Sequence, residues 1–273
     1  MFNVRIKSFY GGEQVQIFSH SMASEGDRSS KKCNPETGEI YERIRGHYEH
    51  VPFEDEDKTL VTDMPDLEYS SYKSFIRTKK TVYDIARSNC WEWFLTFTFS
   101  PDKVDRYSYE ECASKMSNWL KYMRKQCPDM VYLVVPEKHK DGAFHFHGLF
   151  SNCYKLGLRF SGHYDNSGRP IFNVGKYNYG FTTATQVSDS KRAASYLSKY
   201  ITKDLCSVSM NRKRYWVSRN AERPVVEEYL LENLEDERLF EVISSFNVTH
   251  MKKVHNAFVD VTYLEVGQSM RKT

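Results

Sequence analysis

The chain has 273 residues, 40% of them hydrophobic and 15% aromatic, enough to bury a core as one domain with appendages or as two small domains. No apolar run approaches the roughly 20 residues of a membrane-spanning helix, and the N-terminus lacks the layout of a secretion signal, so we expect a location in a reducing, host bacterial cytoplasm. A formal net charge of +3 does not by itself indicate nucleic-acid binding, and six cysteines without a Cys-x-x-Cys pair favour neither a zinc ribbon nor a disulfide framework.

The N-terminal residues 1–89 are expected to form an accessory part of the domain. Residues 1–20 alternate well enough for a strand or hairpin, most clearly at Val15–Phe18. Residues 21–60 are polar and charged and are expected to form loops or an irregular insertion. A helix is expected from Tyr69 to Ser88.

A strand and a second helix follow. Trp93–Phe99 alternates as a strand does, and Ser108 with Glu111 forms a capping-box signature where a helix begins after Pro101. Apolar residues recur along this helix at intervals of three and four residues, so we expect them to pack in the core. These residues are Met116, Trp119, Leu120 and Met123.

The next two segments are predicted to pair as a β-hairpin. Val131–Glu137 is a β-branched apolar run that ends in a proline and a carboxylate, and residues 138–142 form a compact polar loop. In the strand that follows, His145 and His147 point to the same face because successive side chains alternate. The hairpin would bring Glu137 next to these two imidazoles.

Two histidines and one carboxylate suit a divalent cation with coordination positions left open for phosphate oxygens. Cysteine is absent nearby, which argues against a closed structural zinc site. His139 is the alternative third ligand in place of Glu137. The competing interpretation is an ordinary half-buried strand whose histidines are hydrogen-bonded or face solvent.

Residues 189–204 are predicted to form a basic helix that carries two tyrosines, after candidate strands at 171–174 and 181–185. Tyr196 and Tyr200 are four residues apart and so lie on one helical face, and Lys199 and Lys203 each follow a tyrosine by three residues. A phenol with a reference pKa of about 10 is a poor nucleophile unless a cation or metal favours its ionised form. The alternative is that this tyrosine pair only packs in the core.

Positive residues concentrate between 191 and 223, interleaved with aromatic residues, as expected of a surface that holds phosphates and stacks unpaired bases. The candidate DNA-binding residues are Arg192, Arg212, Lys213, Arg214, Tyr215, Trp216 and Arg219. Beyond Pro224 the chain becomes acidic, which favours a covering or protein-binding role for residues 224–273. We expect these residues to form an acidic helical extension.

Together these motifs resemble those of the HUH endonucleases, and more narrowly the rolling-circle replication initiators of small phages and plasmids. The resemblance covers about residues 90–223: the strand Trp93–Phe99, Glu137 with His145 and His147, and the tyrosine helix. Two tyrosines with the Tyr-x-x-Lys pattern are similar to those of the microvirus-like initiators. The segment Arg214–Asn220 is similar to one that follows the tyrosine helix in phage and plasmid members.

The resemblance implies an α+β fold of the RRM-like kind, with a central antiparallel sheet and helices packed on one face. It implies that His145, His147 and Glu137 bind Mg²⁺ or Mn²⁺, and that a tyrosine cleaves single-stranded or extruded origin DNA to leave a 5′-phosphotyrosine. We expect Tyr200 to attack first and Tyr196 to resolve the product. Alternatives are an HUH transposase or relaxase, and a non-catalytic module that binds single-stranded DNA.

The sequence contains no Gly-x-x-x-x-Gly-Lys-Ser/Thr motif of a P-loop helicase. A host helicase is therefore expected to unwind the template and a host polymerase to extend the free 3′ end.

Overall fold

The computed structural model describes residues 1–22, 32–33, 40–44, 47–50, 66–202, 205, 209, 212–231, 247–255 and 259–267. The chain forms two compact units. One combines Met1–Pro65 with Val225–Thr273, and the other spans Asp66–Pro224. The helix expected at 69–88 is therefore part of the second unit, together with the predicted 90–223 core.

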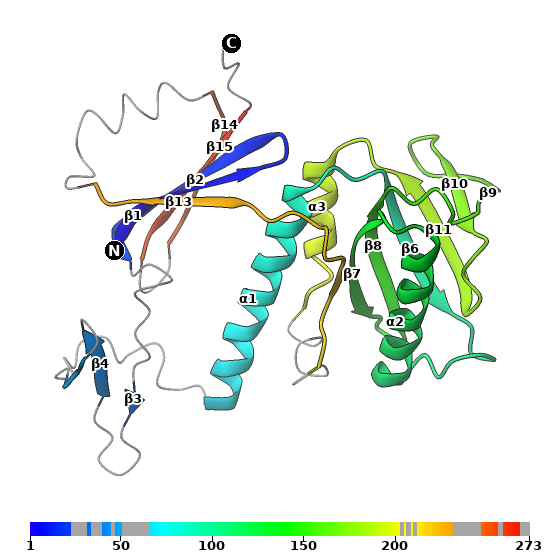
Figure 1. Cartoon of the computed structure of the whole chain (residues 1–273), viewed down its shortest axis with the longest axis horizontal. Helices are drawn as coiled ribbons and strands as arrows, with labels where there is room; N and C mark the ends of the chain where they lie inside the picture. The colour runs from blue at the N-terminus through cyan, green and yellow to red at the C-terminus, as the bar shows by residue number, and fades with distance from the viewer. Residues whose placement is uncertain are drawn as a thin grey trace. The chain divides into compact units, whose positions relative to one another are not determined.

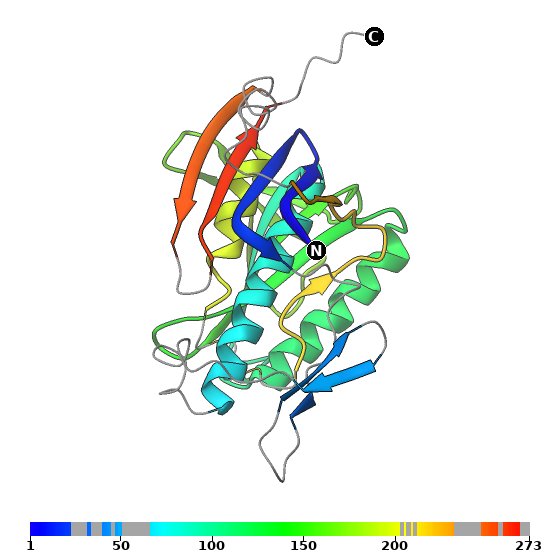
Figure 2. The same cartoon turned by 90° about the vertical axis from the view of Figure 1, so that its left-hand side faces the viewer.

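The first unit contains a five-stranded antiparallel sheet in the order β13-β1-β2-β15-β14 (Figure 2). Its strands are β1 (Phe2–Phe9), β2 (Gly12–Met22), β13 (Val225–Tyr229), β14 (Val248–Val254) and β15 (Val261–Val266). β1 and β2 confirm the hairpin expected in the first 20 residues. Alternation along them places Val4, Val15 and Leu264 in one small apolar cluster.

Two expectations for this unit differ from the structure. The described residues between 225 and 266 form strands rather than the expected helical extension, because β-branched runs there pair with β1 and β2. The acidic residues 232–241 lie outside the described residues. Within the segment 21–60, expected as loops, β3 (Lys32–Cys33), β4 (Ile40–Ile44) and β5 (His47–His50) form a small sheet.

The second unit is built on a seven-stranded antiparallel sheet in the order β12-β7-β8-β6-β11-β10-β9 (Figure 1). Its strands are β6 (Trp93–Phe99), β7 (Val131–Lys138), β8 (Phe144–Ser151), β9 (Leu158–Tyr164), β10 (Pro170–Val174), β11 (Gly180–Gln186) and β12 (Trp216–Val217). Its helices are α1 (Asp66–Ser88), α2 (Tyr109–Gln126) and α3 (Ser190–Ser198). The predicted strand at 93–99 and the hairpin at 131–150 are thereby confirmed.

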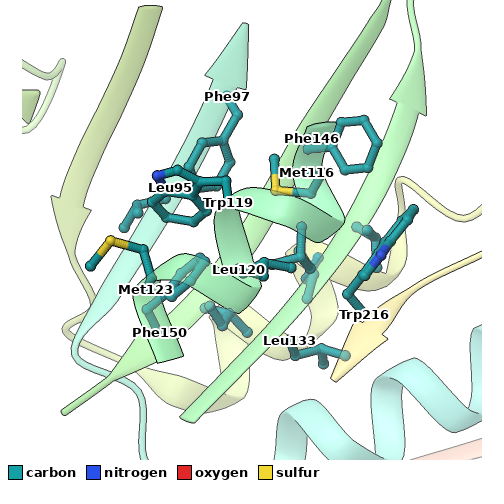
Figure 3. Close-up of a cluster of buried hydrophobic side chains, with 14 of the residues drawn as sticks. Leu95, Phe97, Met116, Trp119, Leu120, Met123, Leu133, Phe146, Phe150 and Trp216 are labelled. Atoms are coloured by element: carbon teal, nitrogen blue, oxygen red, sulfur yellow. The ribbon is translucent and has the colours of Figure 1, made fainter. Parts of the chain in front are cut away.

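Helix α2 begins and packs as its sequence predicts. The Ser108 side chain accepts a hydrogen bond from the Glu111 backbone N–H and caps the first turn. The four predicted core residues of α2 are buried and lie over β6 and β8 (Figure 3). Trp119 packs edge-on against Phe97, with ring centroids 4.9 Å apart. This contact helps fix α2 on one face of the sheet.

The helices lie on both faces of the sheet, which corrects the expectation that they share one. Odd-numbered residues of β6, such as Leu95 and Phe97, point toward α2. Even-numbered residues of β6, such as Phe94, point to the other face, where Phe94 contacts Tyr196 of α3. α1 packs against α3 and β7 on that side. The open sheet face implied by the family resemblance is therefore partly covered.

The turn between β7 and β8 explains how the two strands stay in register. Gly142 has a φ of +89°, in the left-handed region that glycine adopts without a Cβ clash. The His139 N–H donates to the Ala143 carbonyl, and the Gly142 N–H donates to the His139 carbonyl, each at 2.9 Å. The turn sets the register in which Glu137 stands opposite His145.

Candidate active site

The two predicted metal-binding histidines lie on β8, next to Glu137 on β7. Glu137 pairs directly with His145, and Val135 pairs with His147. The carboxylate Oε2 of Glu137 lies 2.7 Å from Nε2 of His147, and His147 is only 5% exposed. The register and this hydrogen bond bring together all three residues that the sequence analysis proposed as ligands.

Two threonines of β6 hold the opposite side of these imidazoles. Thr96 pairs with His147 and Thr98 pairs with His145 across β6 and β8. Their hydroxyl oxygens lie 3.1 Å and 3.2 Å from the Nδ1 atoms. Each hydroxyl can donate to Nδ1 or accept from it, so it can serve either tautomer of the ring. A tautomer with Nδ1–H donating to threonine leaves the Nε2 lone pair free for a cation.

Sequence reasoning missed these threonines, although the signal was available. Thr96 and Thr98 alternate with Leu95 and Phe97 in β6, so they share the face opposite the core. Only the pairing of β6 with β8 places that face beside the histidines.

His139, the alternative third ligand, lies beside the same group. Its Nε2 is 3.2 Å from Oε2 of Glu137. Its ring stacks on the ring of His145, with centroids 3.8 Å apart and an angle of 12°. Glu137 and His139 are therefore both close to the predicted pair, and the geometry leaves both open as the third ligand.

The protonation states of these side chains suit a cation. Burial, followed by the neighbouring His139 and His147, lowers the pKa of His145 to about 4. Burial also lowers the pKa of His147, against the opposing effect of its hydrogen bond to Glu137. Although burial acts to raise it, the pKa of Glu137 is lowered by the hydrogen bond and the charges of the histidines. Neutral imidazoles and an ionised carboxylate are the forms that bind metal.

The resting arrangement is nevertheless not a finished metal site. Within the described ranges, no three His, Cys, Asp or Glu side chains are arranged to hold an ion. Glu137 is hydrogen-bonded to His147 instead. Binding a cation through both residues requires that this hydrogen bond be replaced.

Both tyrosines lie against the histidine cluster. The Tyr200 ring stacks on the His147 ring, with centroids 3.7 Å apart and an angle of 6°. Tyr196 lies 5.3 Å from Tyr200, edge to face, and contacts Phe94 at 5.4 Å. Tyr196 is 50% exposed, whereas Tyr200 is half-buried.

The helix that carries the tyrosines is shorter than the predicted 189–204. α3 begins after the N-cap Asp189 and ends at Ser198, with Lys199 as its C-cap. The backbone N–H of Lys199 donates to Tyr196 and that of Tyr200 to Leu197, three residues back, so the chain tightens there. Tyr200 thus follows the helix rather than standing on its regular face.

The chemistry of the tyrosines depends on their surroundings. Burial, hydrogen bonding with Tyr196 and the charge of Glu137 raise the pKa of Tyr200 well above its usual range. The phenol of Tyr200 is therefore neutral at ordinary pH. Lys199 Nζ lies 5.9 Å from the centre of the Tyr196 ring. The other predicted catalytic lysine, Lys203, lies outside the described residues.

The predicted DNA-binding segment at 212–219 is only partly available to a ligand. Trp216 is 2% exposed, packs on Phe146 at 5.2 Å and donates its indole N–H to Ser117. It is a core residue and cannot stack an unpaired base, which corrects the sequence-based assignment. The segment joins the sheet at β12, so its tryptophan points under α2.

The remaining members of this candidate set differ in their contacts. Arg212 pairs with Glu110 at 2.6 Å, and Arg214 donates to the hydroxyls of Ser74 and Ser209. Tyr215 is half-buried against the core. Exposed side chains that can meet a ligand are Arg212, Lys213, Arg219 and, on α3, Arg192.

The comparisons with known proteins point to DNA replication. Residues 92–205 match the model of a family of replication-associated proteins of the ORF2 type. This match takes in β6, the histidine hairpin and both tyrosines, and it supports a role in initiating replication. Neither the curated proteins nor the solved structures yield a match. Among the described residues, no helix is long and apolar enough to span a membrane.

Proposed function

We propose that this protein initiates rolling-circle replication by nicking single-stranded or extruded origin DNA with a tyrosine nucleophile. The observation that carries the proposal is the stacking of Tyr200 on His147, with Tyr196 in contact with Tyr200. It brings two candidate nucleophiles to the only histidine pair that the sequence analysis selected. The match of residues 92–205 to a replication-associated family supports the same function.

The donor set fits a divalent cation in its chemistry. His145 and His147 are held from Nδ1 by threonines, and Glu137 is ionised. Mg²⁺ or Mn²⁺ bound by these three residues would act as a Lewis acid on the scissile phosphate and favour ionisation of a nearby phenol. His139 is the alternative to Glu137.

The proposed reaction is a transfer of the phosphodiester from DNA to tyrosine. The phenolic oxygen attacks phosphorus, the bond from phosphorus to the 3′ oxygen breaks, and the phenol proton leaves. The products are a 5′-phosphotyrosine and a 3′-OH, which takes up a proton. Lys199 lies close enough to Tyr196 to stabilise negative charge on the phosphate, and Lys203 is proposed for the same role at Tyr200.

Two tyrosines permit two successive transfers. While one holds the 5′ end, the second attacks the regenerated origin after one round of synthesis. The new 3′-OH can then attack the first phosphotyrosine and close a circle. Because the bond energy is conserved in each step, no nucleotide cofactor is needed for rejoining. We propose a host helicase and a host polymerase as the partners that unwind and extend the DNA.

A second candidate is a non-catalytic module that binds single-stranded DNA. Two observations favour it: the histidines and Glu137 are hydrogen-bonded rather than arranged around an ion, and Tyr200 is neutral and half-buried. The third candidate is an HUH transposase or relaxase, which would share the cleavage chemistry.

The test is the formation of a covalent adduct. The protein is incubated with a labelled pool of single-stranded oligonucleotides of randomised sequence, with Mn²⁺ or with EDTA, and resolved in SDS. We expect an SDS-stable adduct with Mn²⁺ that EDTA abolishes, and sequencing of the attached DNA identifies the site.

Matched variants separate chemistry from binding. His147→Ala and Glu137→Ala should lose the adduct while retaining most single-stranded DNA affinity, which depends on phosphate contacts and stacking. Tyr122→Phe, an exposed tyrosine of α2, is the control and should behave as the wild type. An adduct that forms equally well in EDTA contradicts the metal assignment, and no adduct under any condition favours the binding module.

A further inference from the structure

A groove opens beside Tyr196 on the histidine-bearing face of the sheet. Phe94 and Thr96 of β6, with Thr183 and Thr185 of β11, line it, and α3 lines one side. Thr183 pairs directly with Thr96, and Thr96 contacts Nδ1 of His147. The groove is therefore continuous with the histidine cluster at one end.

Hydroxyl groups and cations dominate this lining. Six hydroxyl side chains other than tyrosine are Thr96, Ser167, Thr183, Thr185, Ser188 and Ser195. The basic side chains are Arg169, Lys191, Arg192 and Lys199, against Asp189 as the acidic member of the lining. Hydroxyls and cations together are the groups that contact phosphate and sugar oxygens of nucleic acids.

The two arginines are held in place by carboxylates. Arg169 pairs with Asp165 at 2.7 Å, and Arg192 pairs with Asp189 at 3.3 Å. Asp189 is also the N-cap of α3 and accepts from the Arg192 backbone N–H. These contacts orient both guanidinium groups and leave part of their donors directed elsewhere, because one guanidinium carries five N–H groups.

An exposed aromatic ring lies on the same strand as the threonines. Phe181 of β11 is 57% exposed and pairs directly with Thr98, which contacts His145. Directly paired residues in antiparallel strands share a face, so Phe181 lies on the histidine-bearing face. Its ring offers a surface for an unpaired base next to the predicted cation site.

We propose that β11 carries one flank of the cleaved strand: the groove binds its sugar–phosphate backbone and Phe181 stacks one of its bases. This inference rests on the proposed nicking function for its position beside the scissile bond. The sheet order β12-β7-β8-β6-β11 puts β11 and β12 on opposite sides of the histidine strand β8. The proposed path therefore leads away from the basic segment at 212–219.

The test measures binding of a fluorescent 30-residue oligothymidylate in EDTA, over a range of salt concentrations. The variant Lys191→Gln/Arg192→Gln removes two charges from the groove. The control Lys121→Gln/Lys125→Gln removes two from the exposed surface of α2 on the opposite face. Only the groove variant should lower the slope of log affinity against log salt, by about 0.7 for each phosphate that the protein no longer neutralises.

Two further variants test the uncharged contacts. Thr183→Val/Thr185→Val keeps side-chain shape and β propensity but removes the hydroxyls, and should weaken binding several-fold with an unchanged salt slope. Phe181→Ala should weaken binding about tenfold, with Phe181→Trp restoring it, because stacking tolerates any aromatic ring. Melting curves verify that each variant is folded.

The outcomes separate this inference from the proposed function. If the wild type forms a covalent adduct but the groove and Phe181 variants bind oligothymidylate as the wild type does, the groove assignment is wrong and nicking stands. If no adduct ever forms but the same variants bind more weakly, the groove is a DNA-binding site and nicking is wrong. Equal weakening by the α2 control variant would reduce the effect to net charge and overturn the assignment.

Discussion

The phenol ring of Tyr200 lies parallel to the imidazole of His147, with centroids 3.7 Å apart. This contact ties the end of the tyrosine helix to the strand that carries the predicted ligands. It also makes the two tyrosines unequal, because Tyr200 is half-buried and neutral whereas half of Tyr196 is exposed beside the groove. Sequence spacing alone, four residues on one helical face, made them equivalent.

The threonines behind the histidines should control cation affinity. Thr96→Val and Thr98→Val each remove the hydroxyl that holds one Nδ1 atom, so we expect Mn²⁺ to bind about 10- to 100-fold more weakly. Titration calorimetry with Mn²⁺ measures the effect directly, without a DNA substrate. Thr185→Val is the control, since Thr185 shares the face and pairs with Phe94 rather than with a histidine. Unchanged Mn²⁺ affinity in both variants would show that the threonines do not position the ligands.

Stability should fall in mild acid because of His145. Its pKa is lowered to about 4, whereas an unfolded histidine titrates near about 6.5. Between these values the unfolded chain binds a proton that the folded chain does not, so the free energy of unfolding decreases as pH falls from about 6.5 toward about 4. Urea unfolding in EDTA at several pH values measures this loss.

The variant His145→Gln removes this titration and should show a weaker pH dependence over the same window. His163→Gln removes an exposed histidine of β9 and serves as the control. The assignment fails if His145→Gln and the wild type lose stability in parallel.

Much of the core unit was predictable from local patterns. The capping residues of α2, its buried stripe and the β7–β8 hairpin follow from short-range chemistry that a single segment contains. Glu137, His145 and His147 come together because strand register converts sequence spacing into proximity. The threonine contacts could not be predicted in the same way, since they depend on which strand pairs with the other edge of β8.

Gly148, which follows the second histidine, should tolerate no side chain. A Cβ there would lie 2.5 Å from Cε2 of Phe150 and 2.9 Å from Cγ2 of Val134, both fully buried. We expect Gly148→Ala to cost about 1–3 kcal/mol of stability, as overpacking in a core does. Chemical denaturation measures the loss.

A double-mutant cycle with Phe150→Leu identifies the cause. In that background Gly148→Ala should cost less, because the closest ring atom is gone. An identical cost in both backgrounds would mean that the clash with Phe150 is not the source.

Trp216 should act on stability rather than on DNA affinity. Its indole is buried against Phe146 and donates to Ser117, so Trp216→Ala should cost about 3–5 kcal/mol. Trp216→Phe keeps most of the ring and should bind oligothymidylate with the affinity and salt slope of the wild type. A stable Trp216→Phe protein with much weaker binding would restore the tryptophan as a stacking residue.

Sequence reasoning placed Trp216 on the DNA surface because it sits among basic residues. Charge along the chain does not reveal which side chains a short edge strand turns inward, and β12 turns Trp216 under α2. The same limit applies to the groove: Thr183, Thr185 and Arg169 are ordinary polar residues in the sequence, and only the sheet order brings them to Tyr196.

The most direct test of the central claim is mass spectrometry of the covalent protein–DNA adduct formed with Mn²⁺, on the wild type and on Tyr196→Phe, Tyr200→Phe and the double variant. The account predicts phosphotyrosine-linked nucleotides at Tyr196 or Tyr200 in the wild type, at the remaining tyrosine in each single variant, and none in the double variant. An adduct that persists in the double variant, or that maps to a residue outside this pair, would contradict it.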